Sequence, residues 1–507
     1  MTATDLLASD FATLPDLIRA HAAERADKPA LIAEDRAITY AALDRLVDRV
    51  AAALQRDGVG PRDAVAIVGA PSIFYAAAFL GALRAGAAAA PLAPSATDEA
   101  LAAMIADCDA PIVFADAPAA ERLANQPIAA KRVSLDDWDA WLAPQGAAPA
   151  PAAIAPQDPF NIIYSSGTTG TPKGIVQSHA MRWAHINRNA RANFGEAVTM
   201  IATPLYSNTT LVSFLPTLGW GGTAVLMAKF DARRFLELAE RHRATHAMLV
   251  PVQYQRIMAL ADFDRFDLSS FRLKTCTSAP FSPALKADVV ARWPGALVEY
   301  YGMTEGGGTC ALVATSFPDK LHTVGRPLED HDIRLIDDEG NEVPPGGTGE
   351  VVGRSPAMMT GYHNRGAATR DSEWHDPDGN RFIRHGDIGR FDEDGFLILM
   401  DRKKDMIISG GFNIYPSDLE AVLGQHPGVA DCAVVGVPST RWGETPIGIY
   451  VARGDAAETP ADILAWVNAR LGKTQRLADL HRVEELPRSA IGKVLKRELR
   501  DRIGEVA

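Results

Sequence analysis

A loop of small residues directly after an apolar run most constrains the fold of this chain. Residues 164–174 read YSSGTTGTPKG, and the run before them, FNIIY at 160–164, is typical of a buried strand. The loop therefore leaves the end of a strand, which is where α/β folds bind ligands. Its glycines let the backbone approach an anion, and its hydroxyls and single lysine can bind phosphate oxygens. The candidate phosphate-binding residues are Ser165, Thr168, Thr169 and Lys173.

This loop differs from two commoner kinds of glycine-rich segment. A Walker A loop needs GxxxxGK[ST], whereas here Pro172 precedes Lys173 and Gly174 follows it. A flexible linker would not usually follow a buried strand or select so few residue types. We therefore interpret the segment as a phosphate-binding loop of another kind.

The size and charge of the chain limit the classes of protein to which it can belong. With 507 residues, 47% of them hydrophobic, it can bury more than one core, so two or more domains are expected. A net charge of −12 argues against nucleic acid as a partner. The four cysteines share no CxxC spacing, which predicts neither a zinc site nor a disulfide framework and fits a cytoplasmic protein. The longest apolar run, 73–83, is too short for a transmembrane segment and is expected to form a buried helix, and the N-terminus lacks the features of a signal peptide.

The pattern of the sequence changes twice along the chain. Strand-like runs near 224, 246, 272 and 296 alternate with helix-like segments, which predicts βα units and a largely parallel sheet. From residue 332, short strands with turn signals indicate a smaller β-rich subdomain. The charged run DRKKD at 401–405 then precedes a mixed α+β segment, and its position between two patterns favours a hinge.

Two further strings carry candidate ligand residues. YYGMTEGGG at 300–308 follows a strand-like run, which places Tyr301, Thr304 and Glu305 at a ligand-binding strand end. A carboxylate beside phosphates needs a cation, so Glu305 suggests Mg²⁺, which takes one or two protein carboxylates plus phosphate oxygens. Asp387, in HGDIG, is of the type that accepts ribose hydroxyls. Taken alone, each string favours a simpler interpretation: Glu305 is then a solvated loop residue, and Asp387 is then a turn residue.

A Gly-Lys turn near the C-terminus places Lys493 ahead of a predicted amphipathic helix. The predicted apolar stripe of this helix is Ile491, Leu495, Leu499 and Ile503. Its cations Lys496, Arg497 and Arg500 are expected to face solvent. Lys493 precedes the helix and could reach into a cleft.

Taken together and in this order, the strings resemble the motifs of the adenylate-forming superfamily, which includes acyl-CoA synthetases, aryl-CoA ligases, luciferases and peptide-synthetase adenylation domains. The matching strings are YSSGTTGTPKG, YGMTE, HGDIG, DRKKDMIISGGFNIYP and GKVLKREL, and the resemblance runs from residue 15 to 500. It implies an α/β fold with a large N-terminal domain of parallel-type sheets and helices, a small β-rich subdomain, and a small mobile α+β lid. The corresponding boundaries are 1–400 for the AMP-binding domain, 401–405 for the hinge and 406–507 for the lid.

The resemblance also implies a role for each matching residue. Thr168, Thr169 and Lys173 hold the triphosphate, Thr304 contacts the α-phosphate, and Glu305 binds Mg²⁺. Tyr301 stacks on adenine, and Asp387 holds the ribose with help from Arg402. Lys493 reaches the carboxylate and the ribose-phosphate bridge, and Lys404 is the hinge residue that swings it away. The implied CoA-binding residues are Gly410, Gly411, Trp442 and Arg476.

Two strings depart from the family pattern and bear on substrate choice. PLYSNTT at 204–210 carries Ser207 where many relatives have histidine, which either admits a wider or partly polar acyl group or is neutral. The string TQRL at 474–477 keeps Arg476 as its single cation for contact with the CoA nucleotide. The predicted acyl-pocket residues are Tyr206, Ser207, Asn208, Ser278, Ala279, Gly302, Met303 and Gly306.

The function implied is an ATP-dependent, Mg²⁺-dependent carboxylic acid:CoA ligase. It would form an acyl adenylate and pyrophosphate, then an acyl-CoA thioester and AMP, with a fatty, arylalkanoic or hydroxycinnamic acid as substrate. The alternative is an adenylation enzyme that loads a carrier protein; a luciferase-like oxygenase is a third reading. The expected partners are the acid, ATP and CoA, without nucleic acid or a transmembrane segment, and a homodimer is compatible with these observations.

Overall fold

The computed structural model describes residues 1–165, 173–187, 193–409, 412–454, 458–472, 475–489 and 492–504. It contains two compact units, between which the chain passes several times. The first comprises Met1–Leu321, Pro327–Asp332 and Arg354–Ile383; the second comprises His322–Arg326, Ile333–Gly353 and Arg384–Ala507. The domain boundary at residue 400 and the hinge at 401–405 stay predictions.

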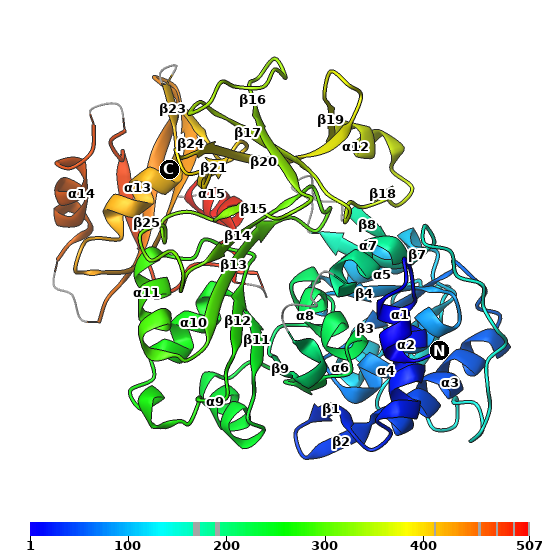
Figure 1. The fold of residues 1–507 in the computed structure, drawn as a ribbon. Coiled ribbons are helices and arrows are strands. Elements are labelled where there is room, and N and C mark those ends of the chain that lie inside the picture. Colours follow the sequence, from blue (N-terminus) through cyan, green and yellow to red (C-terminus); the bar gives the residue numbers. More distant parts are fainter. Residues whose placement is uncertain are drawn as a thin grey trace. The chain divides into compact units, whose positions relative to one another are not determined.

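The strand-like runs between 198 and 302 form the centre of a nine-stranded sheet in the first unit (Figure 1), ordered β15-β14-β13-β12-β11-β9-β10-β1-β2. Adjacent strands from β1 to β13 in this order are parallel, whereas β2 and β14 pair antiparallel at the two ends. The predicted, largely parallel sheet is therefore confirmed. The strands are β1 (Pro29–Ala33), β2 (Arg36–Thr39), β9 (Val198–Ile201), β10 (Thr223–Leu226), β11 (His246–Leu249), β12 (Leu273–Cys276), β13 (Ala296–Gly302), β14 (Thr309–Val313) and β15 (Arg326–Pro327).

A seven-stranded sheet carries the segment on either side of the phosphate loop. Its order is β18-β8-β7-β4-β3-β5-β6, and β7 and β8 pair antiparallel. The strands are β3 (Ala64–Val68), β4 (Ala88–Leu92), β5 (Ile112–Ala115), β6 (Lys131–Ser134), β7 (Pro159–Ser165), β8 (Lys173–Ser178) and β18 (Gly361–Tyr362). The run FNIIY thus lies in a strand, as predicted, and the loop leaves its end.

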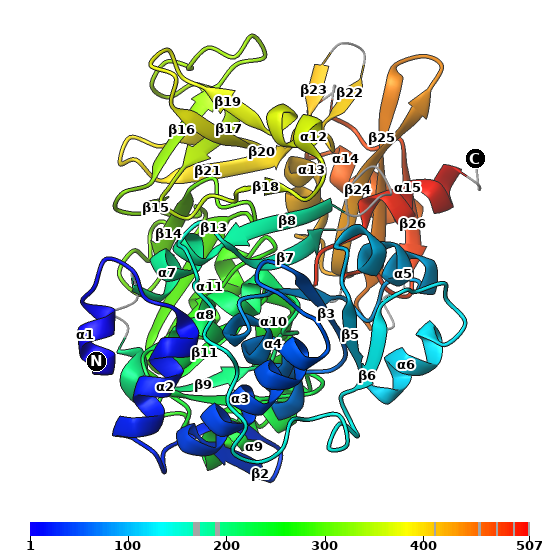
Figure 2. The same cartoon turned by 90° about the vertical axis from the view of Figure 1, so that its right-hand side faces the viewer.

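Helices bury the faces of both sheets. The apolar run at 73–83 forms the buried helix α4, as predicted, and α4 packs between α3 and the seven-stranded sheet (Figure 2). Gly81 allows this close packing, because a Cβ there would collide with Val50 of α3. The helices of the first unit are α1 (Ala3–Leu7), α2 (Leu14–Glu24), α3 (Tyr40–Arg56), α4 (Ile73–Arg84), α5 (Asp98–Asp107), α6 (Ala117–Leu123), α7 (His179–Asn187), α8 (Asn208–Gly219), α9 (Ala232–Arg241), α10 (Pro251–Met258), α11 (Pro283–Arg292) and α12 (Gly366–Asp371), with short 3₁₀ turns at Phe194–Glu196 and Phe263–Arg265.

The nine-stranded sheet has a separate core on each face. One core joins its side chains to α9, α10 and α11, and the other joins them to α2, α4 and α8. Both faces are therefore covered, as a parallel sheet requires. The end of β13 lies at the edge of this arrangement, where the next loop carries Thr304 and Glu305.

The second unit contains two smaller sheets. In one, β17 pairs with β16 and β20, and β21 pairs with β20; in the other, β22 to β26 form a five-stranded sheet packed with three helices. The predicted β-rich segment and α+β segment are both present. The elements are β16 (Asp332–Ile336), β17 (Thr348–Arg354), β19 (Glu373–His375), β20 (Arg381–Phe391), β21 (Leu397–Arg402), β22 (Ile407–Ser409), β23 (Phe412–Ile414), β24 (Val429–Ser439), β25 (Gly443–Ala452), β26 (Asp479–Val483), α13 (Pro416–Leu423), α14 (Pro460–Asn468) and α15 (Lys496–Gly504), of which β19 and the start of β20 belong to the first unit.

Candidate active site

Strands β7 and β8 hold both ends of the phosphate loop. Ser165, the last residue of β7, lies opposite Lys173, the first residue of β8, in antiparallel register. Thr168 and Thr169 lie outside the described residues. The Lys173 ammonium lies 5.2 Å from the centre of the Tyr362 ring, which is within the range of a cation–π contact. The sheet thus fixes the backbone of the predicted phosphate-binding lysine, and the Tyr362 ring contacts its ammonium group.

The loop after β13 brings Glu305 to the same tyrosine. Tyr362 donates its hydroxyl hydrogen to Glu305 Oε1 at 2.9 Å, and burial together with this carboxylate raises the pKa of Tyr362. Gly306, the next residue, has φ +77°, and a Cβ there would collide with the Ala357 carbonyl oxygen. Tyr362 therefore connects the predicted phosphate cation, Lys173, to the predicted metal ligand.

The environment of Glu305 fits Mg²⁺ better than a metal held by protein alone. Among the described residues, no group of three or more His, Cys, Asp or Glu side chains could hold a metal ion. Mg²⁺ commonly binds one or two carboxylates and completes its shell with phosphate oxygens and water. Glu305 would supply that carboxylate, and Tyr362 would orient it.

Side-chain hydrogen bonds place Ser278 and Asn208, which are among the predicted acyl-pocket residues. Ser278 follows β12 with φ +84°, a conformation that strains a non-glycine residue, and its hydroxyl lies 2.5 Å from the Thr209 hydroxyl. The Asn208 side-chain oxygen, at the start of α8, accepts a hydrogen bond from Arg182 at 2.9 Å. The remaining predicted residues occupy three places: Tyr206 and Ser207 directly before α8, Ala279 after β12, and Gly302 and Met303 with Gly306 at the end of β13 and in the loop beyond it.

A buried polar cluster, which the sequence does not predict, joins these segments. Arg182 on α7, Gln177 on β8 and Asn161 on β7 are all fully buried. Arg182 donates to Asn161 Oδ1 (2.8 Å) and to Gln177 Oε1, and Gln177 Nε2 donates to the Thr304 carbonyl oxygen (2.6 Å). We call Asn161, Gln177, Arg182 and Asn208 the Arg182 cluster. Its sequence signal is weak: single polar residues interrupt apolar stretches.

In the second unit, the predicted ribose ligand is paired with its predicted helper. Asp387 on β20 lies opposite Arg402 on β21, and Arg402 Nε is 2.8 Å from Asp387 Oδ1. Asp387 is 9% exposed, so the guanidinium partly neutralises a carboxylate that is largely removed from water. The pair presents an oriented carboxylate, which is the chemistry that binding two ribose hydroxyls requires.

Lys493 lies in a braced turn directly before α15. Its backbone N–H donates to the Ser489 hydroxyl at 3.2 Å, and Gly492 has φ +78°. Arg488 fastens the turn, donating to the Gly492 carbonyl at 2.7 Å and to Asp431 at 2.6 Å. The lysine thus projects from a backbone whose shape is fixed on both sides.

Other cations surround Lys493 within the second unit. Loss of hydration, together with the charges of Arg402 and Lys404, lowers the pKa of Lys493 to about 8, while Asp387 and Asp405 oppose the shift. The side chain remains exposed to solvent, so water weakens these charge interactions. Lys493 therefore loses its proton at a lower pH than an ordinary lysine.

The prediction that the cations of α15 face solvent is wrong for two of them. Lys496 lies 2.8 Å from Glu420, and Arg500 pairs with Asp405, beside the predicted hinge residue Lys404. Arg497, the third of these predicted cations, keeps a largely exposed side chain, 4.0 Å from Asp501. The helix also begins at Lys496 rather than before Leu495, and Ile491 lies outside the described residues.

The predicted CoA-binding residues are only partly described. Gly410 and Gly411 lie outside the described residues, and Arg476 is exposed. Trp442 is 47% exposed, and the Arg441 guanidinium lies 4.7 Å from the centre of its ring. An aromatic side chain left in water at a predicted ligand site is notable, because large apolar side chains are usually covered.

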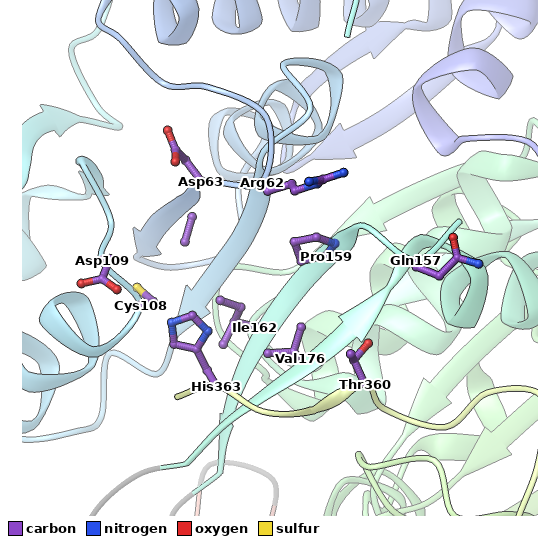
Figure 3. A pocket seen from close by; sticks show the side chains of 11 residues that line it. Arg62, Asp63, Cys108, Asp109, Gln157, Pro159, Ile162, Val176, Thr360 and His363 are labelled. Atoms are coloured by element: carbon purple, nitrogen blue, oxygen red, sulfur yellow. The ribbon is translucent and has the colours of Figure 1, made fainter. Parts of the chain in front are cut away.

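A pocket of about 340 Å³ lies in the first unit (Figure 3). It includes Ile162 and Val176 of β7 and β8, together with charged residues such as Arg62 and Asp63. These strand residues alternate with Asn161 and Gln177, so they point to the opposite face of the sheet. None of the predicted site residues lines this pocket.

The chain matches family models over most of its length. The model for AMP-binding enzymes matches residues 18–363, and the model for their C-terminal domain matches residues 418–493. The chain belongs to the AMP-binding enzyme family, and the predicted superfamily, fold class and enzyme class, an AMP-forming acid–thiol ligase, are confirmed. As predicted, enzymes of this class use ATP, Mg²⁺ and CoA. Among the described residues, no helix is long and apolar enough to cross a membrane.

Three comparisons illustrate the range of its relatives. The chain is 35% identical to a feruloyl-CoA synthase of an Amycolatopsis species, over 92% of this chain and 94% of that protein. It is 31% identical to a fatty acid–[acyl-carrier-protein] ligase of Streptomyces coeruleorubidus, covering 97% and 96%. Its structure resembles ATP-bound MatB from Rhodopseudomonas palustris with a TM-score of 0.86, 28% identity, and coverage of 98% and 100%.

Proposed function

We propose that this chain activates an aromatic carboxylic acid of the hydroxycinnamic or arylalkanoic type and transfers it to CoA in the cytoplasm. The observation that carries the choice of acid is the 35% identity to a feruloyl-CoA synthase across nearly the full length of both chains. The half-buried Tyr206 and the hydroxyls of Ser207 and Ser278 are compatible with an aromatic acid that bears polar substituents.

The first half-reaction needs charge neutralisation more than proton transfer. The acid's carboxylate oxygen bonds to the α-phosphorus of ATP as the bond to the bridging oxygen breaks, and pyrophosphate leaves with the electron pair. We assign Lys173 to the β- and γ-phosphates, Thr304 to the α-phosphate, and Lys493 to the acid and the ribose-phosphate bridge. Fixed cations aimed at developing negative charge are an effective means of lowering such a barrier. Mg²⁺ bound at Glu305 would supply further charge compensation to the phosphates.

In the second half-reaction the CoA sulfur bonds to the acyl carbonyl carbon and AMP leaves, while the thiol proton passes to solvent. We assign Gly410 and Gly411 to the passage for the pantetheine arm, and Trp442 to packing against that arm. Lys404 is assigned as the hinge residue, with the hinge at 401–405 joining domains 1–400 and 406–507. A thiol held against an activated acyl phosphate needs no dedicated base, because binding supplies the orientation.

A pyrophosphate-release screen tests the choice of acid. Hydroxycinnamic, arylalkanoic, benzoic, fatty and dicarboxylic acids would be compared with ATP, Mg²⁺ and CoA present. We expect hydroxycinnamic or arylalkanoic acids to exceed the other classes by about tenfold in kcat/KM, the discrimination that a shaped apolar pocket provides. Comparable rates across all classes would refute a shaped aromatic pocket.

Transfer to a carrier protein is the second candidate, because the chain is also similar to a fatty acid–[acyl-carrier-protein] ligase. The two acceptors separate in one assay, in which preformed acyl adenylate is offered either CoA or a phosphopantetheinylated carrier protein. We expect CoA to be consumed and the carrier to remain unloaded. The opposite result would identify the carrier protein, and not CoA, as the acyl acceptor.

A further inference from the structure

Arg182 is a buried cation without a charged partner in the first unit. It is 0% exposed, and no carboxylate of a described residue pairs with it. The neighbouring segments outside the described residues, 166–172 and 188–192, contain no Asp or Glu. Burial lowers the pKa of Arg182 to about 9, which still leaves it charged at neutral pH. Burying an unpaired charge is costly, so the position needs a reason beyond filling space.

The acceptors of Arg182 come from three different elements. They are Asn161 Oδ1 on β7, Gln177 Oε1 on β8 and Asn208 Oδ1 at the start of α8, and His185 Nδ1 lies 3.4 Å away. A guanidinium is planar and its donors have fixed directions, so it holds these acceptors in a defined arrangement. Asn161 Nδ2 also donates to Gln177 Oε1 at 2.9 Å, which holds the Gln177 amide from a second side.

Gln177 connects these hydrogen-bonded side chains to the Thr304 backbone. Its oxygen is engaged by Arg182 and Asn161, so its nitrogen is directed to the Thr304 carbonyl, where it donates at 2.6 Å. Through Asn208, the same guanidinium holds the first turn of α8, next to Tyr206 and Ser207. One side chain thus connects the segment assigned to the α-phosphate with the segment assigned to the acyl group.

We infer that Arg182 is a positioning residue that sets the acyl-pocket helix α8 and the Thr304 loop in register for attack of the carboxylate on the α-phosphorus. The inference rests on the proposed function. Displacing reacting groups by about 1 Å can cost roughly 100-fold in rate, so a rigid link between the two segments has a direct effect on adenylation. Neutral acceptors suit this role, because a carboxylate cannot donate a hydrogen bond onward as the Gln177 amide does.

A matched pair of variants separates positioning from stability. Gln177→Glu and Asn161→Asp each place one carboxylate against the same guanidinium and each remove one amide NH₂ group. Only Gln177→Glu removes the donor to Thr304 and sets a carboxylate oxygen against its carbonyl. Asn161→Asp instead loses its bond to Gln177.

The readouts are the melting temperature and the steady-state constants of acid-dependent ATP–pyrophosphate exchange. We expect the two variants to have similar melting temperatures, and Gln177→Glu to lose about tenfold more kcat than Asn161→Asp. The KM for ATP should change less than about twofold, because Lys173 is untouched. If the two variants lose kcat equally, in proportion to their decreases in melting temperature, the inference is overturned and Arg182 is a structural cation only.

A third variant tests the connection to α8. Asn208→Ala removes one acceptor of Arg182 at a half-buried position, and we expect it to raise the KM for the acid about fivefold with the KM for ATP unchanged. An unchanged KM for the acid would remove α8 from the inference. If the wild-type protein shows no pyrophosphate exchange with any of the acids, the proposed function and this inference are both refuted. If the wild type is active but the variants are equivalent to one another, the inference alone is refuted.

Discussion

The two lysines assigned to adenylation, one in each unit, are held in contrasting ways. Lys173 is the first residue of β8, in register with Ser165 of β7, and its ammonium lies over the Tyr362 ring. Lys493 lies in a turn, where loss of hydration, together with the cations Arg402 and Lys404, lowers its pKa to about 8. One charge is supported by a sheet and an aromatic ring, and the other is opposed by like charges.

This difference suggests a division of work between the lysines. A supported cation suits groups that stay negative throughout the reaction, such as the phosphates that leave as pyrophosphate. A cation destabilised by its neighbours gains most when a negative charge arrives beside it, because the arriving charge relieves the repulsion. We therefore expect Lys173 to contribute mainly to binding ATP and Lys493 mainly to the transition state.

Removing Lys493 should have the largest effect. Lys493→Ala is expected to reduce adenylation roughly 1000-fold, the loss typical of removing a group that stabilises transition-state charge. Thioester formation from synthetic acyl adenylate should be retained. The measurements are pyrophosphate exchange and CoA consumption, and Arg497→Ala, which removes an exposed cation of the same segment, is the control. Equal losses in both half-reactions would contradict the assignment.

Removing Lys173 should have a smaller effect of a different kind. Lys173→Met is expected to raise the KM for ATP by about 10- to 100-fold, because a charge-assisted hydrogen bond contributes about 1.5–3 kcal/mol, with less change in kcat. Initial rates of pyrophosphate exchange with ATP varied would measure both constants. If Lys173→Met lowered kcat and left the KM for ATP unchanged, both lysines would act mainly on the transition state, which would contradict the proposed difference.

The lowered pKa of Lys493 predicts a pH dependence. The protonated form is the active one, so kcat/KM for adenylation should fall as the pH rises through 8 and above, by up to about tenfold for each unit beyond the pKa. Bound ATP and acid favour the charged lysine, so the fall in kcat should lie at higher pH. Lys493→Arg, whose side chain does not titrate in this range, should lack the inflection; an unchanged inflection would assign it to another group.

Loosening the turn that carries Lys493 should have the smallest effect. Arg488→Ala removes the bonds to the Gly492 carbonyl and to Asp431, and we expect a loss of about fivefold in adenylation from reduced orientation. Asp431→Asn, which keeps an acceptor for Arg488, should be nearly unchanged. Activity equal to wild type in Arg488→Ala would show that the turn needs no brace.

Much of the fold followed from local patterns in the sequence. Apolar runs of strand length, alternating with amphipathic segments, correctly predicted the parallel strands β10 to β13 and the buried helix α4. The motif strings correctly predicted the enzyme class through their resemblance, in the same order, to those of the adenylate-forming superfamily.

The Arg182 cluster could not be predicted in the same way. Asn161 and Gln177 lie 16 positions apart, and only the antiparallel register of β7 and β8 places them opposite each other. Thr304 is 127 positions from Gln177. The prediction that the cations of α15 face solvent failed for a related reason. Lys496 and Arg500 pair with Glu420 and Asp405, which lie on distant segments of the chain. Periodicity predicts which face of an element is polar and says nothing of its partner.

Strand β8 carries both Lys173, at its first position, and Gln177, four positions later. Side chains alternate along a strand, so these two point to the same face, with their Cα atoms about 13 Å apart at 3.3 Å per residue. A single inserted or deleted residue between them would send one of the two to the opposite face. We therefore expect related enzymes that retain both residues to preserve this spacing through evolution, even where the surrounding side chains diverge.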